Sequence, residues 1–175
     1  MNDLETALTA TRGAVDRMIA AADARVSVWT TPRAPGKWSP SQLIEHVARS
    51  IEESANEIEG NPTKFPHLPF FLKPIARGFL FNRVLRSGAF PKARTSGAFN
   101  PVSGPATPGE GRQRIGAALA RFERACRAQA RSPVDSVVFG RVTLTDYVRF
   151  QEIHTRHHTK QLESQAAEVS RVTRA

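Results

Sequence analysis

The sequence contains a single cysteine, Cys126, and no long apolar run. One cysteine excludes an internal disulfide and any metal site built from several thiolates. No apolar run reaches the roughly 18 residues that a membrane span needs. Residues 1–15 carry acids early and lack the basic-then-apolar pattern of a secretory signal. We therefore expect a cytoplasmic protein without a transmembrane segment, in which Cys126 is a small packing residue.

The composition is that of a globular chain with an excess of basic residues. Of 175 residues, 40% are apolar and 23% charged, which argues against wholesale disorder and suits one domain over residues 1–175. The formal net charge is +9 and the pI is about 10.9. Such a surface attracts nucleic acid, lipid headgroups or an acidic small molecule, so the charge alone identifies no partner.

Four segments show the three-and-four spacing of apolar residues that is typical of amphipathic helices. Two of them begin with a complete start signal. Ser39, Pro40 and Gln42 form one capping box with proline at the first helical position, and Thr107, Pro108 and Glu110 repeat it. The segments span residues 3–29, 39–59, 107–131 and 144–169. This pattern predicts an all-α protein, a four-helix bundle with long proline-rich crossover connections. We expect residues 137–139 to be a connection against the bundle.

The second and third predicted helices are separated by a segment of different character, the basic insertion (60–109). It has no acidic residue, seven Lys or Arg and seven of the ten phenylalanines. A short helix over residues 74–86 is expected within it, with loop elsewhere.

Two histidines of the last predicted helix lie in its apolar stripe. At about 100° per residue, His154 and His158 fall with six other residues in a sector roughly 80° wide. The others are Leu144, Tyr147, Gln151, Leu162, Gln165 and Val169. An i, i+4 pair places two imidazoles one turn apart, close enough to bind one ion. Each could equally be a core histidine bonded to a backbone carbonyl or to Gln161.

His46 lies one turn into the second predicted helix, at the edge of its apolar stripe. It can face inward toward a neighbouring helix, although a partly exposed helix histidine is the alternative. Three histidines from two helices would leave a fourth coordination position open, which suits a catalytic zinc-type site better than a closed structural one.

Two stretches of the chain, GKWSPSQLIEHV and FGRVTLTDYVRFQEIHTRHHTKQLE, resemble the DinB-like superfamily of metal-dependent four-helix proteins. They include the FG-x-hydroxyl-Leu and His-x-x-His-His-x-x-Gln signatures of one uncharacterised subfamily. The resemblance implies a divalent metal, zinc or nickel, on His46, His154 and His158. Trp38, Gln42 and Gln161 match the supporting positions of the two motifs.

The resemblance also implies a reaction class, because family members include thiol-dependent S-transferases and isomerases. We therefore expect a metal-dependent enzyme, either a transferase that uses a low-molecular-weight thiol or a small-molecule hydrolase. The sequence identifies no catalytic acid or base; Glu45 and Asp146 are expected to be solvated or capping residues. Arg77, Arg83 and Arg86 of the basic insertion are candidates to bind the carboxylate of an anionic thiol or substrate.

The alternative hypothesis is a binding protein without catalysis. In that case five phenylalanines with interleaved basic residues dock on an anionic membrane surface or a partner. They are Phe65, Phe70, Phe71, Phe79 and Phe81. An insertion of this composition can also fold back as a lid and bury them. No nucleic-acid-binding motif accompanies the positive charge, so we do not expect nucleic acid as a partner. A homodimer remains open.

Overall fold

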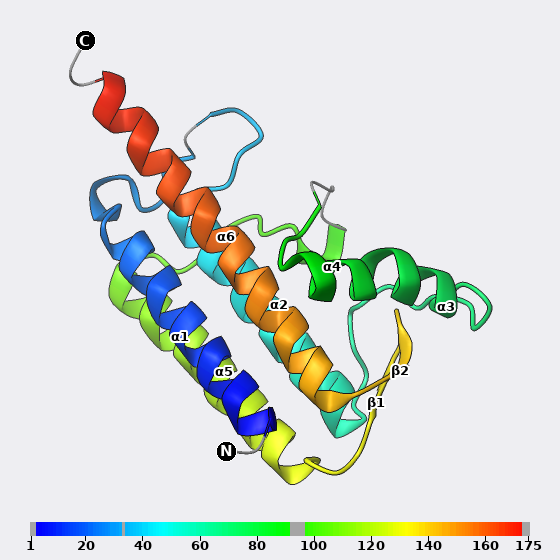
Figure 1. Cartoon of the computed structure of the whole chain (residues 1–175). Helices are drawn as coiled ribbons and strands as arrows, with labels where there is room; N and C mark the ends of the chain where they lie inside the picture. Colours follow the sequence, from blue (N-terminus) through cyan, green and yellow to red (C-terminus); the bar gives the residue numbers. More distant parts are fainter. Residues whose placement is uncertain (1–2, 33, 92–96, 173–175) are drawn as a thin grey trace.

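The computed structural model describes residues 3–32, 34–91 and 97–172, without the side chains of residue 98 and residues 165–172. Most of the described chain is helical, as expected (Figure 1). The four long helices are α1 (Asp3–Asp23), α2 (Pro40–Glu59), α5 (Pro108–Ala128) and α6 (Leu144–Val172). The side chains of Gln165 and Val169, which we placed in the α6 stripe, lie outside the described residues.

The long helices lie side by side around a shared apolar interior. α1 packs chiefly on α6 and α2 chiefly on α5, while α1 also contacts α5 and α2 also contacts α6 (Figure 1). The interior contains fully buried side chains from all four helices, among them Met18, Ile51, Phe122 and Leu162. Each helix buries one apolar stripe in this shared interior, and this packing determines which residues of α2 face α6.

Both predicted start signals form caps. Ser39 Oγ accepts from the Gln42 amide, and the Gln42 side chain accepts from the Ser39 amide, which completes the capping box of α2. Thr107 Oγ1 likewise accepts from the Glu110 amide at the start of α5. The Glu110 carboxylate, however, accepts from the Ala106 amide rather than from Thr107. The caps fix where α2 begins, and so where His46 lies on it.

The first helix is shorter than the sequence suggested. α1 ends at Asp23, and a short 3-10 helix (Val26–Val28) follows. Trp29 is buried where that helix ends, and its indole N–H donates to the Pro105 carbonyl at 2.8 Å. The Ser41 amide donates to the Trp29 carbonyl. These contacts hold Trp29 beside the start of α2. The chain leaves the line of α1 before Trp29 and so brings its side chain to these partners.

Residues 134–142 form a small hairpin that we did not predict. β1 (Val134–Ser136) pairs antiparallel with β2 (Gly140–Val142), with Val134 opposite Val142. The Val137–Phe139 run, expected as a connection, is the turn between these strands. Gly140 has φ +69°, a conformation that glycine adopts without strain. The expected all-α fold therefore carries one two-stranded sheet.

The basic insertion contains a helix longer than expected. It comprises α3 (Lys73–Ala76), a π-helical turn (Arg77–Phe81) and α4 (Asn82–Ser87), and a 3-10 turn (Gly97–Phe99) follows later. Its phenylalanines divide into two groups. Phe81 and Phe99 are buried and Phe65 stacks on Phe99, whereas Phe70, Phe71 and Phe79 are exposed. Neither a fully buried lid nor a fully exposed aromatic face is correct. None of the described helices is both long and apolar enough to cross a bilayer.

Candidate metal centre

The histidine cluster lies at the interface between α2 and α6. His46 is buried in the second turn of α2, between the core residues Leu43 and Val47. His158 is buried on α6 one turn after His154, which keeps partial exposure. On the same stripe, Tyr147 and Gln151 are buried one to two turns earlier. The i, i+4 spacing therefore places both α6 histidines on the face that α2 covers.

The Nε2 atoms of the three histidines converge on one point. His154 Nε2 lies 3.1 Å from His158 Nε2 and 3.3 Å from His46 Nε2, and all three atoms lie within 4.8 Å of one another. A tetrahedral zinc ion with Zn–N bonds of about 2.0–2.1 Å separates its ligand nitrogens by about 3.4 Å. The observed spacing is thus close to the spacing of nitrogens that share one ion.

The outer nitrogens of two rings determine which tautomer is present. His46 Nδ1 lies 2.9 Å from the Phe99 carbonyl oxygen, which only accepts, so Nδ1 must carry the proton. His158 Nδ1 lies 3.1 Å from Gln161 Oε1, and the Gln161 amide nitrogen donates to His157 Nε2. A neutral ring with Nδ1–H has its lone pair on Nε2. His46 and His158 therefore both direct an Nε2 lone pair into the cluster.

Burial keeps these rings neutral at physiological pH. Desolvation is the main cause that lowers the pKa of His46, and it lowers the pKa of His158 to about 3. The pKa of His154 is lowered well below its usual value, first by burial and then by the neighbouring His158 and His46. Metal ions bind only unprotonated imidazole. The three donors are consequently in the state that a metal needs.

The lone pairs that face one another inside the cluster test whether a metal fits. His154 Nδ1 is buried and has no hydrogen-bond partner among the described residues. If Nδ1 carries the proton of this ring, three lone pairs face one another; if Nε2 carries it, it donates to only one of the two facing lone pairs. A divalent cation would resolve the repulsion, and imidazole is a donor that zinc and nickel accept. The residues present fit a metal ion.

Aromatic rings enclose the cluster on two sides. Trp38 packs on His46 and His158, with ring centroids 4.7 Å and 6.1 Å away, and its indole N–H donates to Asn100. Phe90 packs on His154 at 5.2 Å. Trp38 was marked in the sequence, whereas Phe90 was not. The only sequence feature that pointed to Phe90 was its place in the phenylalanine-rich basic insertion.

The Phe99 carbonyl is a second contribution that the sequence did not reveal. A backbone carbonyl carries no residue signature, so only the path of the insertion across α2 identifies it. Gln161, by contrast, was marked by its position three residues after His158, and its contact with His158 Nδ1 is the one that such spacing permits. Both groups orient rings of the cluster in the way that outer partners of metal ligands do.

A buried polar chain extends from the cluster along the same interface. Ser50 and Ser54 follow His46 at intervals of four residues on α2, and Gln151 of α6 contacts both. At the far end Tyr147 donates to the Glu57 carboxylate, which also accepts from the Val137 amide at 2.8 Å. Burial raises the pKa of Glu57. The sequence analysis did not single out this carboxylate.

The arginines proposed for anion binding are not part of the histidine cluster. Arg77 donates to the Arg141 carbonyl at 3.0 Å. Arg83 and Arg86 line a surface groove of about 280 Å³ on the insertion helix, and no histidine lines it. Glu45 pairs with Arg49 and Arg114 and is only 12% exposed, so it is not the solvated residue that we expected. At the start of α6, Thr143 Oγ1 accepts from the Asp146 amide and the Asp146 carboxylate accepts from the Thr143 hydroxyl.

Cys126 is buried in α5, and burial raises the pKa of its thiol to about 12. Such a thiol does not ionise at neutral pH, and the nucleophilic form of cysteine is the thiolate. It is a packing residue, as expected.

The comparisons with known proteins identify one family. The family model of the DinB superfamily matches residues 3–162 of the chain. This range contains all three histidines of the cluster. No curated protein and no solved structure matches the chain.

Proposed function

Since the chain belongs to the DinB superfamily, as the sequence resemblance predicted, we propose that His46, His154 and His158 bind one divalent metal ion in the four-helix bundle of that family. The convergence of three Nε2 atoms within 4.8 Å is the observation that carries this proposal. Zinc and nickel are the ions we favour, because both accept three imidazoles and keep a further position open for a substrate.

The proposed reaction is a transfer to or from sulfur. A divalent ion of this kind lowers the pKa of a thiol or of water and so provides a nucleophile at neutral pH. We propose a low-molecular-weight thiol as the cofactor and a small electrophile as the substrate, with hydrolysis of a small substrate as the second candidate. The protein's part is to hold three neutral imidazoles, two of them with the proton fixed on Nδ1, and to limit the access of water through Trp38 and Phe90.

The ionisable side chains near the motifs support a mechanism without a protein carboxylate as base. Glu45 is engaged by Arg49 and Arg114, and the Asp146 carboxylate accepts from the Thr143 hydroxyl at the start of α6. His157 accepts a hydrogen bond from Gln161, and its ring lies 5.1 Å from that of His158. It is the one further imidazole among the described residues that packs against the cluster. We assign it the edge of the site, not a ligand position.

The remaining expectations stay predictions. We still predict that Arg83 and Arg86 bind an anionic group; they line a groove on the insertion helix that no histidine lines. Arg77 is engaged by a backbone carbonyl, which weakens its case as a ligand of an anionic thiol. A cytoplasmic location, a homodimer and the absence of nucleic acid as a partner are likewise untested.

A thiol-binding screen on metal-loaded protein tests the proposed chemistry. Metal-free protein is loaded with zinc or nickel and titrated with several low-molecular-weight thiols by calorimetry, followed by an S-transfer assay with a chromogenic electrophile. We expect at least one thiol to bind the loaded protein and not the metal-free protein or a His154→Ala variant. If thiols bind all three samples equally, the thiol-dependent reaction is wrong, whatever the metal content.

A further inference from the structure

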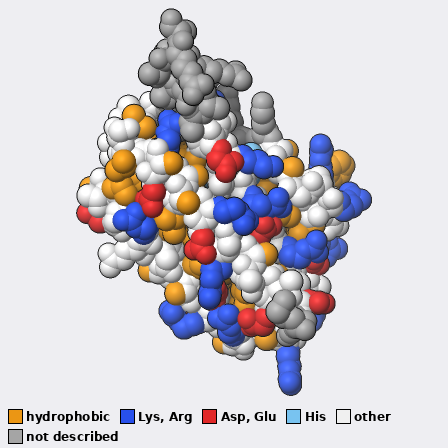
Figure 2. Space-filling view, turned by 60° about the vertical axis from the view of Figure 1, so that its left-hand side comes forward, with side chains coloured by type: hydrophobic (Ala, Val, Ile, Leu, Met, Phe, Trp, Pro, Cys, Tyr) orange, Lys and Arg blue, Asp and Glu red, His pale blue; other side chains and the backbone are white. Residues whose placement is uncertain are grey.

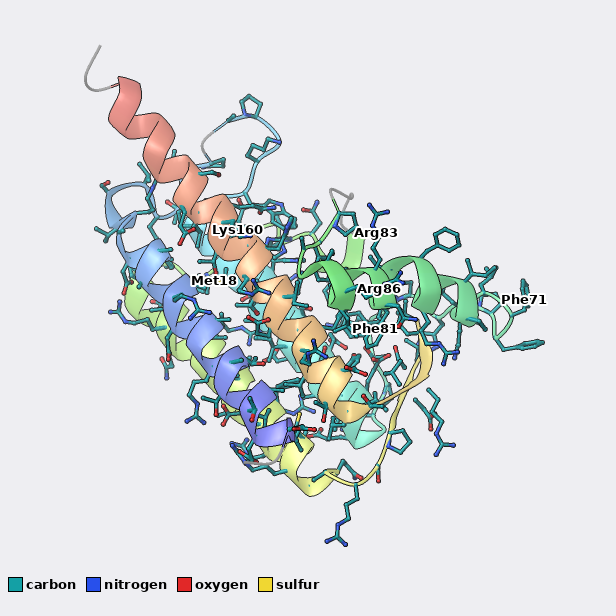
Figure 3. All side chains as sticks on the ribbon, in the orientation of Figure 1. Met18, Phe71, Phe81, Arg83, Arg86 and Lys160 are labelled. Atoms are coloured by element: carbon teal, nitrogen blue, oxygen red, sulfur yellow. The ribbon has the colours of Figure 1, made fainter. Side chains whose placement is uncertain are left out.

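The insertion helix ends in a group of exposed apolar side chains, the apolar tip, that no part of the described chain covers. It consists of Phe70, Phe71, Leu72, Ile75 and Phe79. Phe70 is 84% exposed, Phe79 78%, Phe71 61% and Ile75 54%. Only two other large apolar side chains in the described residues are exposed, Val26 and Val102, and they lie apart in the sequence. Phe71 lies at the far end of the insertion helix and points away from the four long helices (Figure 3).

The insertion helix packs on the rest of the protein through its inner face, and the exposed side chains of the tip lie outside that contact. Phe81 stacks on Phe150 of α6 and packs on Phe139 of the hairpin, and Val84 is fully buried. Arg77 bonds the Arg141 carbonyl of β2. With one face fixed in this way, the helix presents Ile75 and Phe79 outward.

The same outward face carries positive charge behind the tip. Arg83 and Arg86 follow Phe79 by about 6 Å and 10 Å along the helix axis. These residues line one groove with Pro74, Ile75 and Gly78. Neither arginine forms an ion pair with the described residues, and the sequence from 60 to 109 contains no acid.

On the long helices many arginines pair with acids. Arg12 pairs with Glu123, Arg114 with Glu52 and Arg121 with Glu59. Figure 2 shows acidic side chains interspersed among the basic ones on one face of the molecule. The insertion helix therefore differs from the rest of the surface in both charge and apolar exposure.

We propose that the apolar tip inserts into an anionic lipid surface, with Arg83 and Arg86 on the lipid phosphates. Interfacial helices bury an apolar face about 5–10 Å deep and carry basic residues at the headgroups, and this helix presents Ile75 and Phe79 with Arg83 and Arg86 along one groove. A protein partner fits less well, because five side chains on a projecting end offer little of the roughly 800 Å² per partner of a standard interface. The proposal is independent of the metal and of any reaction.

Vesicle flotation of the full chain tests this surface. The probes are vesicles of neutral phosphatidylcholine and vesicles that also contain an anionic phospholipid, each at low and high salt. We expect binding to anionic vesicles only, weakened at least tenfold by high salt because exposed charges are screened. Phe71→Ser/Phe79→Ser and Arg83→Glu/Arg86→Glu should each reduce binding more than about tenfold.

Two control variants separate the tip from general effects. Arg124→Glu/Arg131→Glu changes the net charge by the same amount at exposed positions outside the insertion, and Val102→Ser removes an apolar side chain that is 95% exposed. Both should bind anionic vesicles like the wild type, and circular dichroism should show that every variant is folded. The proposal is wrong if the wild type does not bind anionic vesicles at low salt, or if the control pair loses as much binding as the tip variants. A dimer that Phe71→Ser/Phe79→Ser abolishes without lipid would show instead that the tip contacts a second copy.

Discussion

His46 Nε2 and His154 Nε2 lie 3.3 Å apart across the α2–α6 interface, although both rings are neutral at physiological pH. His46 cannot donate from this nitrogen, because its proton is committed to the Phe99 carbonyl on the other side of the ring. His158 is constrained in the same way by Gln161. The proposed metal ion would explain why three such rings are held together, and most of the predictions below follow from this arrangement.

Gln161→Leu should weaken metal binding without removing a ligand. The substitution leaves the His158 Nδ1–H without its acceptor, and the loss of such an outer partner typically costs 10–100-fold in metal affinity. Competition with a chromogenic chelator measures the change. His157→Ala is the matched control, because it removes the other partner of Gln161 and leaves His158 bonded. Equal affinity in Gln161→Leu and the wild type would mean that Gln161 does not orient the ligand.

The stability of metal-free protein should fall as the pH drops below about 6.5. The folded-state pKa values of His46 and His158 are lowered, that of His158 to about 3, so both rings take up a proton on unfolding below the unfolded pKa. The stability present above pH 6.5 is thus lost as the pH falls toward the folded-state values. Each ring contributes a slope of about 1.4 kcal/mol per pH unit. Urea denaturation between pH 7 and pH 5 measures it.

Glu57 complicates this pH dependence with the opposite sign. Its folded-state pKa is raised, so its contribution is present at low pH and is lost as the pH rises through that value. A His46→Gln/His158→Gln variant isolates the histidine contribution, because it retains Glu57. We expect the variant to lose the part of the acid-side slope that His46 and His158 contribute and to keep the part of His154, whose pKa is also lowered by burial. The same slope in both proteins would contradict the buried, neutral histidines.

Glu57→Leu should lower the free energy of unfolding more than Glu57→Gln. The leucine leaves the Val137 amide without its acceptor, removes that of the Ser136 hydroxyl, and leaves the Tyr147 hydroxyl only the 3.4 Å contact with Ser54 Oγ. Each unsatisfied buried donor costs about 1–3 kcal/mol. Glutamine keeps one acceptor oxygen and so retains part of the network. Urea denaturation of the two variants gives the comparison. Equal stability of the two would show that the hydrogen bonds to Glu57 contribute little.

Gly104→Ala should destabilise the protein and weaken metal binding together. An added Cβ would lie 2.3 Å from the Ser41 carbonyl oxygen, so the loop that follows Phe99 must move away from α2. We expect a loss of about 1–3 kcal/mol in the free energy of unfolding. The control is Gly116→Ala on α5, where a Cβ meets nothing within 4 Å; it should be neutral or stabilising by up to about 1 kcal/mol. Unchanged stability and metal affinity in Gly104→Ala would contradict the close approach.

The sequence predicted the histidine site to the extent that local geometry determines it. The pair His154 and His158 follows from helical spacing, and capping signals place the start of α2 and hence His46 on its second turn. The meeting of His46 with the pair depends on how α2 and α6 pack, which spacing alone does not determine. The resemblance to a known family supplied that step.

Other features depend on tertiary contacts that leave no local signature. Trp29 ends the first helical region early because its ring bonds the distant Pro105 carbonyl. The Val137–Phe139 run became a turn because its neighbours on both sides pair with each other. Phe79 and Phe81 are two residues apart, yet one is 78% exposed and the other 2%, since only Phe81 reaches α6 and the hairpin. Amino-acid composition alone does not distinguish Phe79 from Phe81.

Zinc titration of metal-free wild type, His154→Ala and His157→Ala tests the central claim most directly. The account predicts one ion per wild-type chain and the same for His157→Ala. Affinity in His154→Ala should be reduced by more than about a hundredfold, since a lost ligand costs more than a lost outer partner. All three proteins should remain folded, as judged by circular dichroism. If His154→Ala binds zinc as tightly as the wild type, these three histidines are not a metal site.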